Sequence, residues 1–219
     1  MAVHLLRDLE HLKEHLLYLG SLVEESTDKA IASLLDRNAD LAREVIEGDD
    51  RIDAMEVKVE EEAMKLLALH QPVAADLRFI ITVLKVNNDL ERVGDLAVNI
   101  AARAIDLADD VPLGFQVDFA DMCTTVRSMV HDCLESLVRQ DVAIARRVWT
   151  ADGRVDRIHR EMFGAMEDVM RQDKDCVRRA TLWLSASRHL ERIADLATNI
   201  AEDVIFMVKG EVVRHRDAI

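Results

Sequence analysis

The stretch DLERVGDLAVNIA, from Asp89 to Ala101, occurs again one hundred residues later as HLERIADLATNIA, from His189 to Ala201. Nine of the thirteen positions are identical, and the polar residues among them are Glu, Arg, Asp and Asn. Apolar residues recur at three- and four-residue intervals in both stretches, which is typical of a helix with one buried face. The chain therefore contains a duplicated helix that keeps the same acids in both copies.

The duplication extends toward the N-terminus. The segment LAREVIEGDDRID, from Leu41 to Asp53, aligns without gaps to IARRVWTADGRVD, from Ile144 to Asp156, at an offset of 103 residues. The change in offset falls near ALHQPVAADLR, which has no proline counterpart in the second half. An internal duplication with one small insertion predicts two similar structural units, the first repeat and the second repeat.

The composition favours an all-α fold. Only two prolines and seven glycines interrupt the 219 residues, and Ala, Leu, Val, Glu, Asp and Arg dominate, as in long helices. Glycine, proline and aspartate positions divide each repeat into three helices, which predicts a tandem duplication of a three-helix bundle. The expected helices are 4–47, 50–70, 73–108, 118–150, 153–171 and 174–209, with bends near Asn38 and Asp141. The expected domains are 1–110 and 118–219, joined by a linker at 111–117.

The charge balance limits the classes of partner. The formal net charge is −14, from 42 acidic and 28 basic residues, which disfavours nucleic acid and anionic membrane surfaces and favours cations or a basic protein surface. No apolar run reaches the roughly 18 residues of a membrane span, and the N-terminus lacks a signal-peptide core. The three cysteines form no Cys-x-x-Cys pair and are expected to be reduced. We therefore expect a cytoplasmic protein without direct membrane insertion.

The duplicated helix carries acids at a four-residue spacing. Glu91 and Asp95 project from one face, with Asn99 one turn further along. The second repeat has Glu191, Asp195 and Asn199 in the same arrangement. Two like charges at this spacing destabilise a helix by about 0.2–0.5 kcal/mol unless a cation lies between them. The spacing therefore predicts a counter-ion.

The source of that counter-ion is left open by the sequence. Arg92 and Arg192 lie three residues before the Asp of each pair, so a solvated face with intrahelical salt bridges is one interpretation. A bound metal ion is the other. The duplication favours the metal ion, because a solvated face has no need to keep the acids while neighbours such as Gly94 and Ala194 differ.

A second acidic pair precedes the first in each repeat, and hard cations need oxygen ligands from more than one structural element. These residues are Asp49 and Asp53 in the first repeat, and Asp152 and Asp156 in the second. If the middle and third helices are antiparallel, four carboxylates meet in each repeat. Alternatively, Asp49, Asp50 and Asp152 are helix N-caps, and Asp53 and Asp156 are stabilised by the positive helix end.

Signatures of catalysis are missing from the sequence. No histidine follows a glutamate by three positions, so the Glu-x-x-His signature of di-iron bundles is absent. The chain also lacks His-Glu-x-x-His, the Gly-rich phosphate loops and Gly-x-Ser-x-Gly. We therefore expect a protein that is not an enzyme.

Two longer stretches resemble the PhoU family of phosphate-system regulatory proteins. They are QPVAADLRFIITVLKVNNDLERVGD, residues 71–95, and HLERIADLATNIAEDVIFMVKGEVVRH, residues 189–215. The tandem organisation is also similar, and the resemblance covers nearly the whole chain. It implies a cytoplasmic homodimer that couples the ATPase subunit of the phosphate ABC transporter to a sensor histidine kinase. Such a protein negatively regulates the phosphate-starvation response and modulates phosphate uptake.

The resemblance also implies a metal cofactor, because several family members are similar in binding iron, zinc or other multivalent cations through Glu/Asp-x-x-x-Asp motifs. In this chain the motifs fall on Asp49 and Asp53, Glu91 and Asp95, Asp152 and Asp156, and Glu191 and Asp195. Some relatives have a histidine after the motif aspartate, where this chain has Leu96 and Leu196. A metal-independent helical scaffold is the main alternative, and a carboxylate-bridged iron-binding protein is the second.

Overall fold

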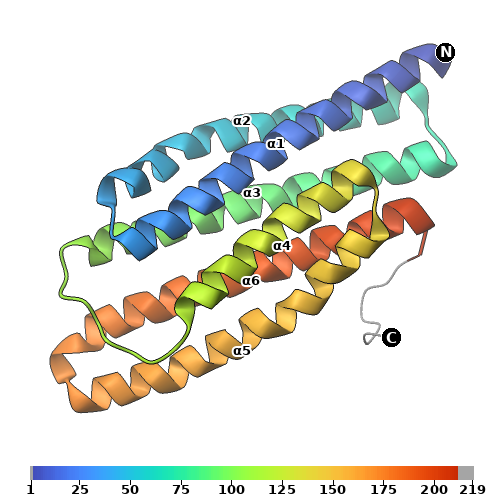
Figure 1. Cartoon of the computed structure of the whole chain (residues 1–219). Helices are drawn as coiled ribbons and strands as arrows, with labels where there is room; N and C mark the ends of the chain where they lie inside the picture. The colour runs from blue at the N-terminus through green and yellow to red at the C-terminus, as the bar shows by residue number, and fades with distance from the viewer. Residues whose placement is uncertain (1, 212–219) are drawn as a thin grey trace.

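The computed structural model describes residues 2–211 and contains helices but no strands in that range (Figure 1). The helices are α1 (Ala2–Asp36), α2 (Ala39–His70), α3 (Ala74–Ala108), α4 (Phe119–Arg139), α5 (Val142–Gln172), the short 3₁₀ helix η1 (Lys174–Cys176) and α6 (Val177–Lys209). The predicted all-α fold with six long helices is confirmed. None of the helices described is long and apolar enough to cross a membrane. Residue 1 and residues 212–219, which the expected domains include, lie outside the described residues.

The two repeats lie side by side. Helices α1, α2 and α3 form one bundle, α4, α5 and α6 form the other, and α3 packs along α6 (Figure 1). Lys85 Nζ of α3 lies 3.0 Å from Asp203 Oδ1 of α6, and Arg178 at the start of α6 reaches Asp110 after the end of α3. The two helices are therefore antiparallel. Buried residues of both repeats form one continuous hydrophobic core.

The first helix of the first repeat ends earlier than predicted. Helix α1 stops at Asp36, and Arg37 adopts a left-handed conformation with φ 55°. Asn38 then caps α2, because its side chain accepts hydrogen bonds from the N–H groups of Asp40 and Leu41. Gly48 lies inside α2, since one interior glycine costs a helix only about 1 kcal/mol. The predicted ranges 4–47 and 50–70 are therefore wrong at their shared boundary.

The second repeat divides at the equivalent position. Helix α4 ends at Arg139, Gln140 is left-handed with φ 53°, and Asp141 caps α5 through the N–H groups of Ala143 and Ile144. The predicted ranges 118–150 and 153–171 are wrong for the same reason, and the predicted bends are the true helix boundaries. The last helix begins at residue 177 after a 3₁₀ turn, instead of at residue 174.

The segment between the repeats is held against both of them. Arg37 donates a hydrogen bond of 2.6 Å to the Asp110 carbonyl, and Arg179 of α6 donates one of 3.0 Å to the Val111 carbonyl. The ring of Phe115 packs edge-on against Trp183 of α6, with ring centroids 5.3 Å apart. These contacts fix the point at which the chain passes from one bundle to the next.

Candidate metal centre

The middle and third helices of the first repeat bring two acidic pairs to one seam. We define the first acidic cluster as Asp49, Asp53, Glu91 and Asp95. A β-carbon added to Gly94 would lie 3.6 Å from Asp49 Oδ1, so α2 and α3 approach closely at this point. Further along, Asn87 of α3 hydrogen-bonds Glu56 of α2. Residues later in α3 therefore lie beside residues earlier in α2, and the two helices are antiparallel.

The carboxylates of the first acidic cluster act on one another electrostatically. Burial, followed by the charges of Asp53, Asp95 and Asp50, raises the pKa of Asp49 to about 6. Burial also raises the pKa of Glu91, with further contributions from Asp95, Glu56, Asp53 and Asp49. The interpretation of Asp49 and Asp50 as N-caps is wrong, because Asn38 caps this helix and both residues lie in its interior. Asp53 likewise lies far from the helix end.

The second repeat has the same arrangement between α5 and α6. We define the second acidic cluster as Asp152, Asp156, Glu191 and Asp195. Burial, followed by the charges of Asp156, Asp195 and Glu191, raises the pKa of Asp152 to about 6. Burial also raises the pKa values of Glu191 and Asp195. Asp152 and Asp156 are interior to α5, which Asp141 caps, so their interpretation as helix-end residues is wrong as well.

One oxygen of Asp152 is buried without a partner. Its Oδ1 atom is shielded from solvent and accepts no hydrogen bond from the described residues. Burying a carboxylate oxygen in this state is unfavourable by several kcal/mol on the order-of-magnitude scale for uncompensated charges. A cation beside Asp152 would offset that cost.

Within the described part of the chain, none of the eight carboxylates forms an ion pair within 4.0 Å. Arg92 and Arg192 are exposed and form no ion pair with them within 4.0 Å, although the charge of Arg192 offsets part of the rise in the pKa values of Glu191 and Asp195. By contrast, Asp121 of α4 is held by Arg154 of α5 at 2.6 Å. The intrahelical salt bridges that were the alternative to a bound cation are therefore not formed.

The eight side chains face one another without closing into a coordination shell. A metal ion needs donor atoms about 2.0–2.6 Å from itself, which places those donors within a few ångström of one another. Between residues 2 and 211, ligand atoms from three residues come within 4.8 Å only in the group His131, Asp132 and Glu135. The exposed side chains of Asp53, Asp95 and Asp195 have solvent around them in which to rotate.

The two asparagines lie one turn beyond the acids. Asn99 Nδ2 donates a hydrogen bond of 2.8 Å to the Asp95 carbonyl of its own helix. Asn199 occupies the corresponding place on α6 and is partly buried. The observed contact of Asn99 is therefore local to the helix.

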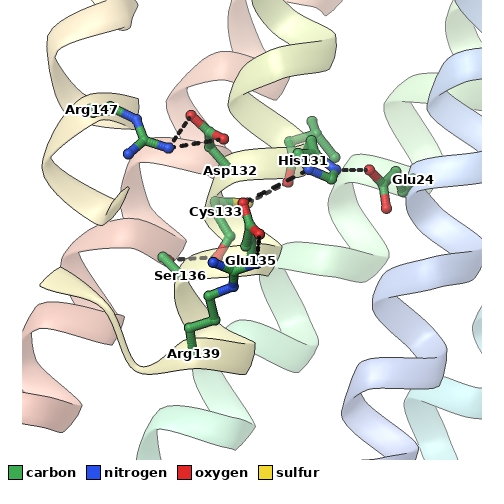
Figure 2. Close-up of polar contacts among 9 residues, drawn as sticks. Glu24, His131, Asp132, Cys133, Glu135, Ser136, Arg139 and Arg147 are labelled. Atoms are coloured by element: carbon green, nitrogen blue, oxygen red, sulfur yellow. Dashed lines mark hydrogen bonds and ion pairs between the residues drawn. The ribbon is translucent and has the colours of Figure 1, made fainter. Parts of the chain in front are cut away.

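The His131 group joins the two repeats and has charge partners of its own (Figure 2). His131 Nδ1 of α4 lies 2.7 Å from Glu24 Oε1 of α1, and this hydrogen bond is the main cause of a raised His131 pKa. Glu135 is paired with Arg139 at 2.8 Å, and Asp132 with Arg147 at 3.5 Å. Because both carboxylates of the group already have a cationic partner, we assign no metal ion to it.

Two residues beside the clusters were missed from the sequence. Glu56 follows Asp49 by seven positions, and His159 follows Asp152 by seven, so both lie on the acidic face of their helix. Asn87 Nδ2 lies 3.0 Å from Glu56 Oε1, and His159 Nδ1 lies 2.7 Å from Ser187 Oγ. The sequence contains a signal for His159 in Asp156-x-x-His159. This motif has the three-residue spacing of a metal-ligand pair but starts with aspartate instead of glutamate.

Comparison of the sequence with known families finds two matches to the PhoU domain, at residues 16–104 and 119–204. The chain is 41% identical over 212 residues to the phosphate-specific transport system accessory protein PhoU homolog of Aquifex aeolicus, covering 97% of this chain and 96% of that protein. It is 40% identical over 210 residues to the homolog of the same name in Pseudomonas aeruginosa, covering 95% and 86%.

Solved structures give the same result for the fold. The crystal structure of PhoU from Pseudomonas aeruginosa superposes with a TM-score of 0.90 at 38% identity, covering 94% of this chain and 99% of that one. The phosphate transport system regulatory protein PhoU from Streptococcus pneumoniae gives a TM-score of 0.84 at 28% identity, covering 95% and 99%. Similarity therefore extends across both repeats.

Proposed function

The chain belongs to the PhoU family, and from this premise we propose that it is an accessory protein of a phosphate-specific transport system that regulates phosphate uptake. The observation that carries the proposal is the 41% identity, over 97% of the chain, to a relative of that name. Both matched domains and both acidic clusters fall within the aligned length.

The proposed role is carried out by contact, without a catalytic step. In the cytoplasm the protein binds the ATPase subunit of the phosphate ABC transporter and a sensor histidine kinase, and it keeps the starvation response off when phosphate is plentiful. The net charge of −14 supports contact with basic surfaces on such partners.

Co-purification tests this role. Tagged full-length protein, expressed in its own cells, should capture the kinase and the transporter ATPase to different extents at high and low phosphate. A strain lacking the protein should express a phosphate-starvation reporter in phosphate-rich medium. Normal repression in the deletion strain, together with no capture of either partner, would show that the proposed role is wrong.

The proposal includes metal ions, namely iron, zinc or another multivalent cation, held by the two acidic clusters. It is supported by eight carboxylates without ion-pair partners, by the raised pKa values of Asp49 and Asp152, and by the unpartnered Asp152 oxygen. A bound cation supplies the direct ion pair that these side chains do not form within the protein and offers open coordination positions to an anion such as phosphate. Asn99 and Asn199 would be outer residues of the two sites.

Elemental analysis tests the metal sites. The variant in which Glu91, Asp95, Glu191 and Asp195 are all replaced by Ala should lose most of the metal that co-purifies with the wild-type protein. A control with the same change in charge replaces four exposed acids elsewhere, Glu10, Glu14, Glu167 and Asp168, and should keep its metal. Equal metal content in wild type and the cluster variant would contradict the assignment.

A metal-independent scaffold is the second candidate function. The observation that favours it is the spacing of the cluster side chains, of which no three described members bring their ligand atoms within 4.8 Å. A scaffold should show the same melting temperature with and without chelator. A cation that binds only the native state should raise the melting temperature, and above its Kd the rise should grow with the logarithm of the free cation concentration.

We propose that the protein acts as a homodimer. Support comes from a row of exposed apolar residues, formed by Leu77 and Ile81 four residues apart on α3 and by Val73 at its N-cap position. Light scattering of the wild-type protein should give twice the mass of the 24.8 kDa chain. The double variant Leu77→Glu and Ile81→Glu should give the mass of one chain if this row forms the contact.

A further inference from the structure

The two acidic clusters differ at one position, and we propose that they select different cations. The first cluster, extended by the carboxylate of Glu56, takes a hard cation such as Mg²⁺ or Mn²⁺. The second, extended by the imidazole of His159, takes a borderline metal such as Zn²⁺ or Fe²⁺. Glu56 and His159 are equivalent by the offset of 103 residues between the middle helices. This inference rests on the proposed metal function.

In the first repeat, Glu56 is oriented by a buried asparagine. Asn87 is only 1% exposed, and its Nδ2 donates hydrogen bonds of 3.0 Å to both the carbonyl and the Oε1 atom of Glu56. One carboxylate oxygen is therefore held against α3, and Oε2 is left to the cluster, where the charge of Glu56 acts on Glu91. All five side chains present oxygen donors, which hard cations prefer.

In the second repeat, His159 is oriented by a buried serine. Ser187 is fully buried, and its hydroxyl donates a hydrogen bond to Met122 Sδ at 3.7 Å. In the tautomer that carries its proton on Nδ1, His159 donates the hydrogen bond of 2.7 Å to Ser187 Oγ, and the hydroxyl proton is directed to Met122. The Nε2 atom is then left with its lone pair. Metal-binding histidines commonly donate their second ring N–H to an oxygen in this way.

The position of His159 places its imidazole with the cluster. It follows Asp156 by three residues on the same helical face. Burial, followed by the charge of Arg188, lowers the pKa of His159 against the smaller opposite effect of Asp156, so the imidazole is favoured in its neutral, metal-binding form. The same cluster contains the buried, unpartnered Oδ1 of Asp152. One nitrogen donor beside several carboxylates is a donor set that suits zinc or iron.

The position occupied by Glu56 or His159 and the position of its hydrogen-bond partner on the third helix both differ between the repeats. The Asn87 and Ser187 positions are equivalent by the offset of 100 residues between the third helices. Asparagine supplies the donor that a carboxylate needs, and serine supplies the acceptor that an imidazole N–H needs. In both repeats the third helix therefore holds one polar atom of the middle-helix side chain and leaves the other for a ligand. A side chain that only filled space would have no need of this matched change.

Competition between Zn²⁺ and Mn²⁺ on the full-length protein tests the inference. The variant Glu91→Ala/Asp95→Ala keeps the second cluster, and Glu191→Ala/Asp195→Ala keeps the first. Zn²⁺ outcompetes Mn²⁺ at most protein sites, so the two preference ratios are compared with each other. We expect the ratio of Zn²⁺ to Mn²⁺ affinity to be at least about tenfold higher for the second cluster. Adding His159→Glu to the first variant, or Glu56→His to the second, should remove the difference, and making both changes should reverse the order.

A spectroscopic measurement assigns the ligand directly. In protein labelled with ¹⁵N-histidine, Zn²⁺ should move the His159 Nε2 resonance, and His159→Gln should remove that change. Ser187→Ala keeps the imidazole but removes its hydrogen bond, and it should weaken Zn²⁺ binding by about tenfold while helical content stays unchanged.

The outcomes separate the two proposals. If both clusters bind metal with the same ratio of Zn²⁺ to Mn²⁺ affinity, the inference is wrong while the proposed metal function stands. If neither half-site variant binds either ion, both are overturned. A Zn²⁺-dependent shift at His159 together with reversal by the swapped residues supports the inference.

Discussion

The two repeats hold the same acids with different packing. In the first, Gly94 of α3 meets Ile52 of α2, where an added β-carbon would lie 3.2 Å from Ile52 Cγ2 and 3.3 Å from Ile52 Cδ1. In the second, the equivalent residues are Ala194 and Val155, so the methyl group gained on the third helix is lost from the middle helix. All four are buried. The total side-chain volume at this contact between facing helices is thus the same in the two repeats.

The largest expected effect tests whether the two repeats are one cooperative unit. Leu90 and Leu190 are equivalent, are 1% and 0% exposed, and belong to the same continuous core. Leu90→Ala and Leu190→Ala should each lower the free energy of unfolding by about 3 kcal/mol. Both tryptophans, Trp149 and Trp183, lie in the second repeat, so fluorescence reports on that repeat and circular dichroism on both. The two probes should give one coincident urea transition in each variant.

Independent bundles would behave differently. Leu90→Ala would then shift only part of the dichroism transition and leave the tryptophan transition at its wild-type midpoint. That result would contradict a shared core.

The second prediction concerns the acids that the repeats have in common. The pKa values of Asp49 and Asp152 are raised from 3.8 to about 6, so the metal-free native state binds protons more tightly than the unfolded chain. The contribution of these two groups to the stability of metal-free protein should therefore fall as pH rises from 4 to 6, by about 1 kcal/mol for each group once solvent screening of these half-buried side chains is included. Asp49→Asn and Asp152→Asn should each remove part of this dependence in chelator-treated protein followed by urea unfolding. Equal slopes in wild type and both variants would show that the pKa values of Asp49 and Asp152 are not raised in the native state.

The third prediction tests the compensation between Gly94 and Ile52. Gly94→Ala crowds the branched side chain of Ile52, which offsets the gain in helix propensity. The same substitution in an Ile52→Val background should be more favourable by about 1 kcal/mol, because the chain then has the residues of the second repeat. Ala194→Gly and Val155→Ile are the matched cycle in the second repeat. Additive effects in the first cycle would show that the two positions do not compensate.

The repeats also show which features the sequence was able to predict. Periodicity and duplication were sufficient for the all-α fold, for six helices and for the faces that carry Glu91 and Glu191, because these features depend on spacing along one helix. The boundary was misplaced because Gly48 and Gly153 were given more weight than the capping side chains of Asn38 and Asp141. Both caps satisfy backbone N–H groups that no other residue reaches, whereas an interior glycine is tolerated.

Contacts between distant parts of the chain leave no pattern of spacing in the local sequence. The seam between α3 and α6 brings Lys85 to Asp203, 118 residues away, and nothing local to either residue indicates the other. The pairing of Glu56 with Asn87, and of His159 with Ser187, was hidden in a different way. The middle helices align at an offset of 103 and the third helices at 100, so equivalent partners are apparent only once the facing helices are in place.

The smallest expected effect lies at the contact between α1 and α4, where two ion pairs are related by the same duplication. Glu24 meets His131 at 2.7 Å, and Asp28 meets Arg127 at 3.1 Å. At the offset of 103 residues, Glu24 corresponds to Arg127 and Asp28 to His131. In both pairs the first repeat supplies the carboxylate and the second repeat supplies the basic side chain. Of the two basic side chains, only the histidine titrates near neutral pH.

The Glu24 carboxylate raises the pKa of His131, so this pair stabilises the native state fully below the ordinary histidine pKa and loses its effect as pH rises through the raised value. The side chain of His131 is 60% exposed, and solvent screening limits the contribution to about 0.5 kcal/mol or less. Glu24→Gln should therefore reduce the difference in unfolding free energy between pH 6 and pH 8, and lower the His131 pKa followed by NMR. Asp28→Asn removes the equivalent pair, whose arginine stays charged across this range, and should leave that difference unchanged. The same pH response in both variants would show that His131 does not provide the titrating contact between the repeats.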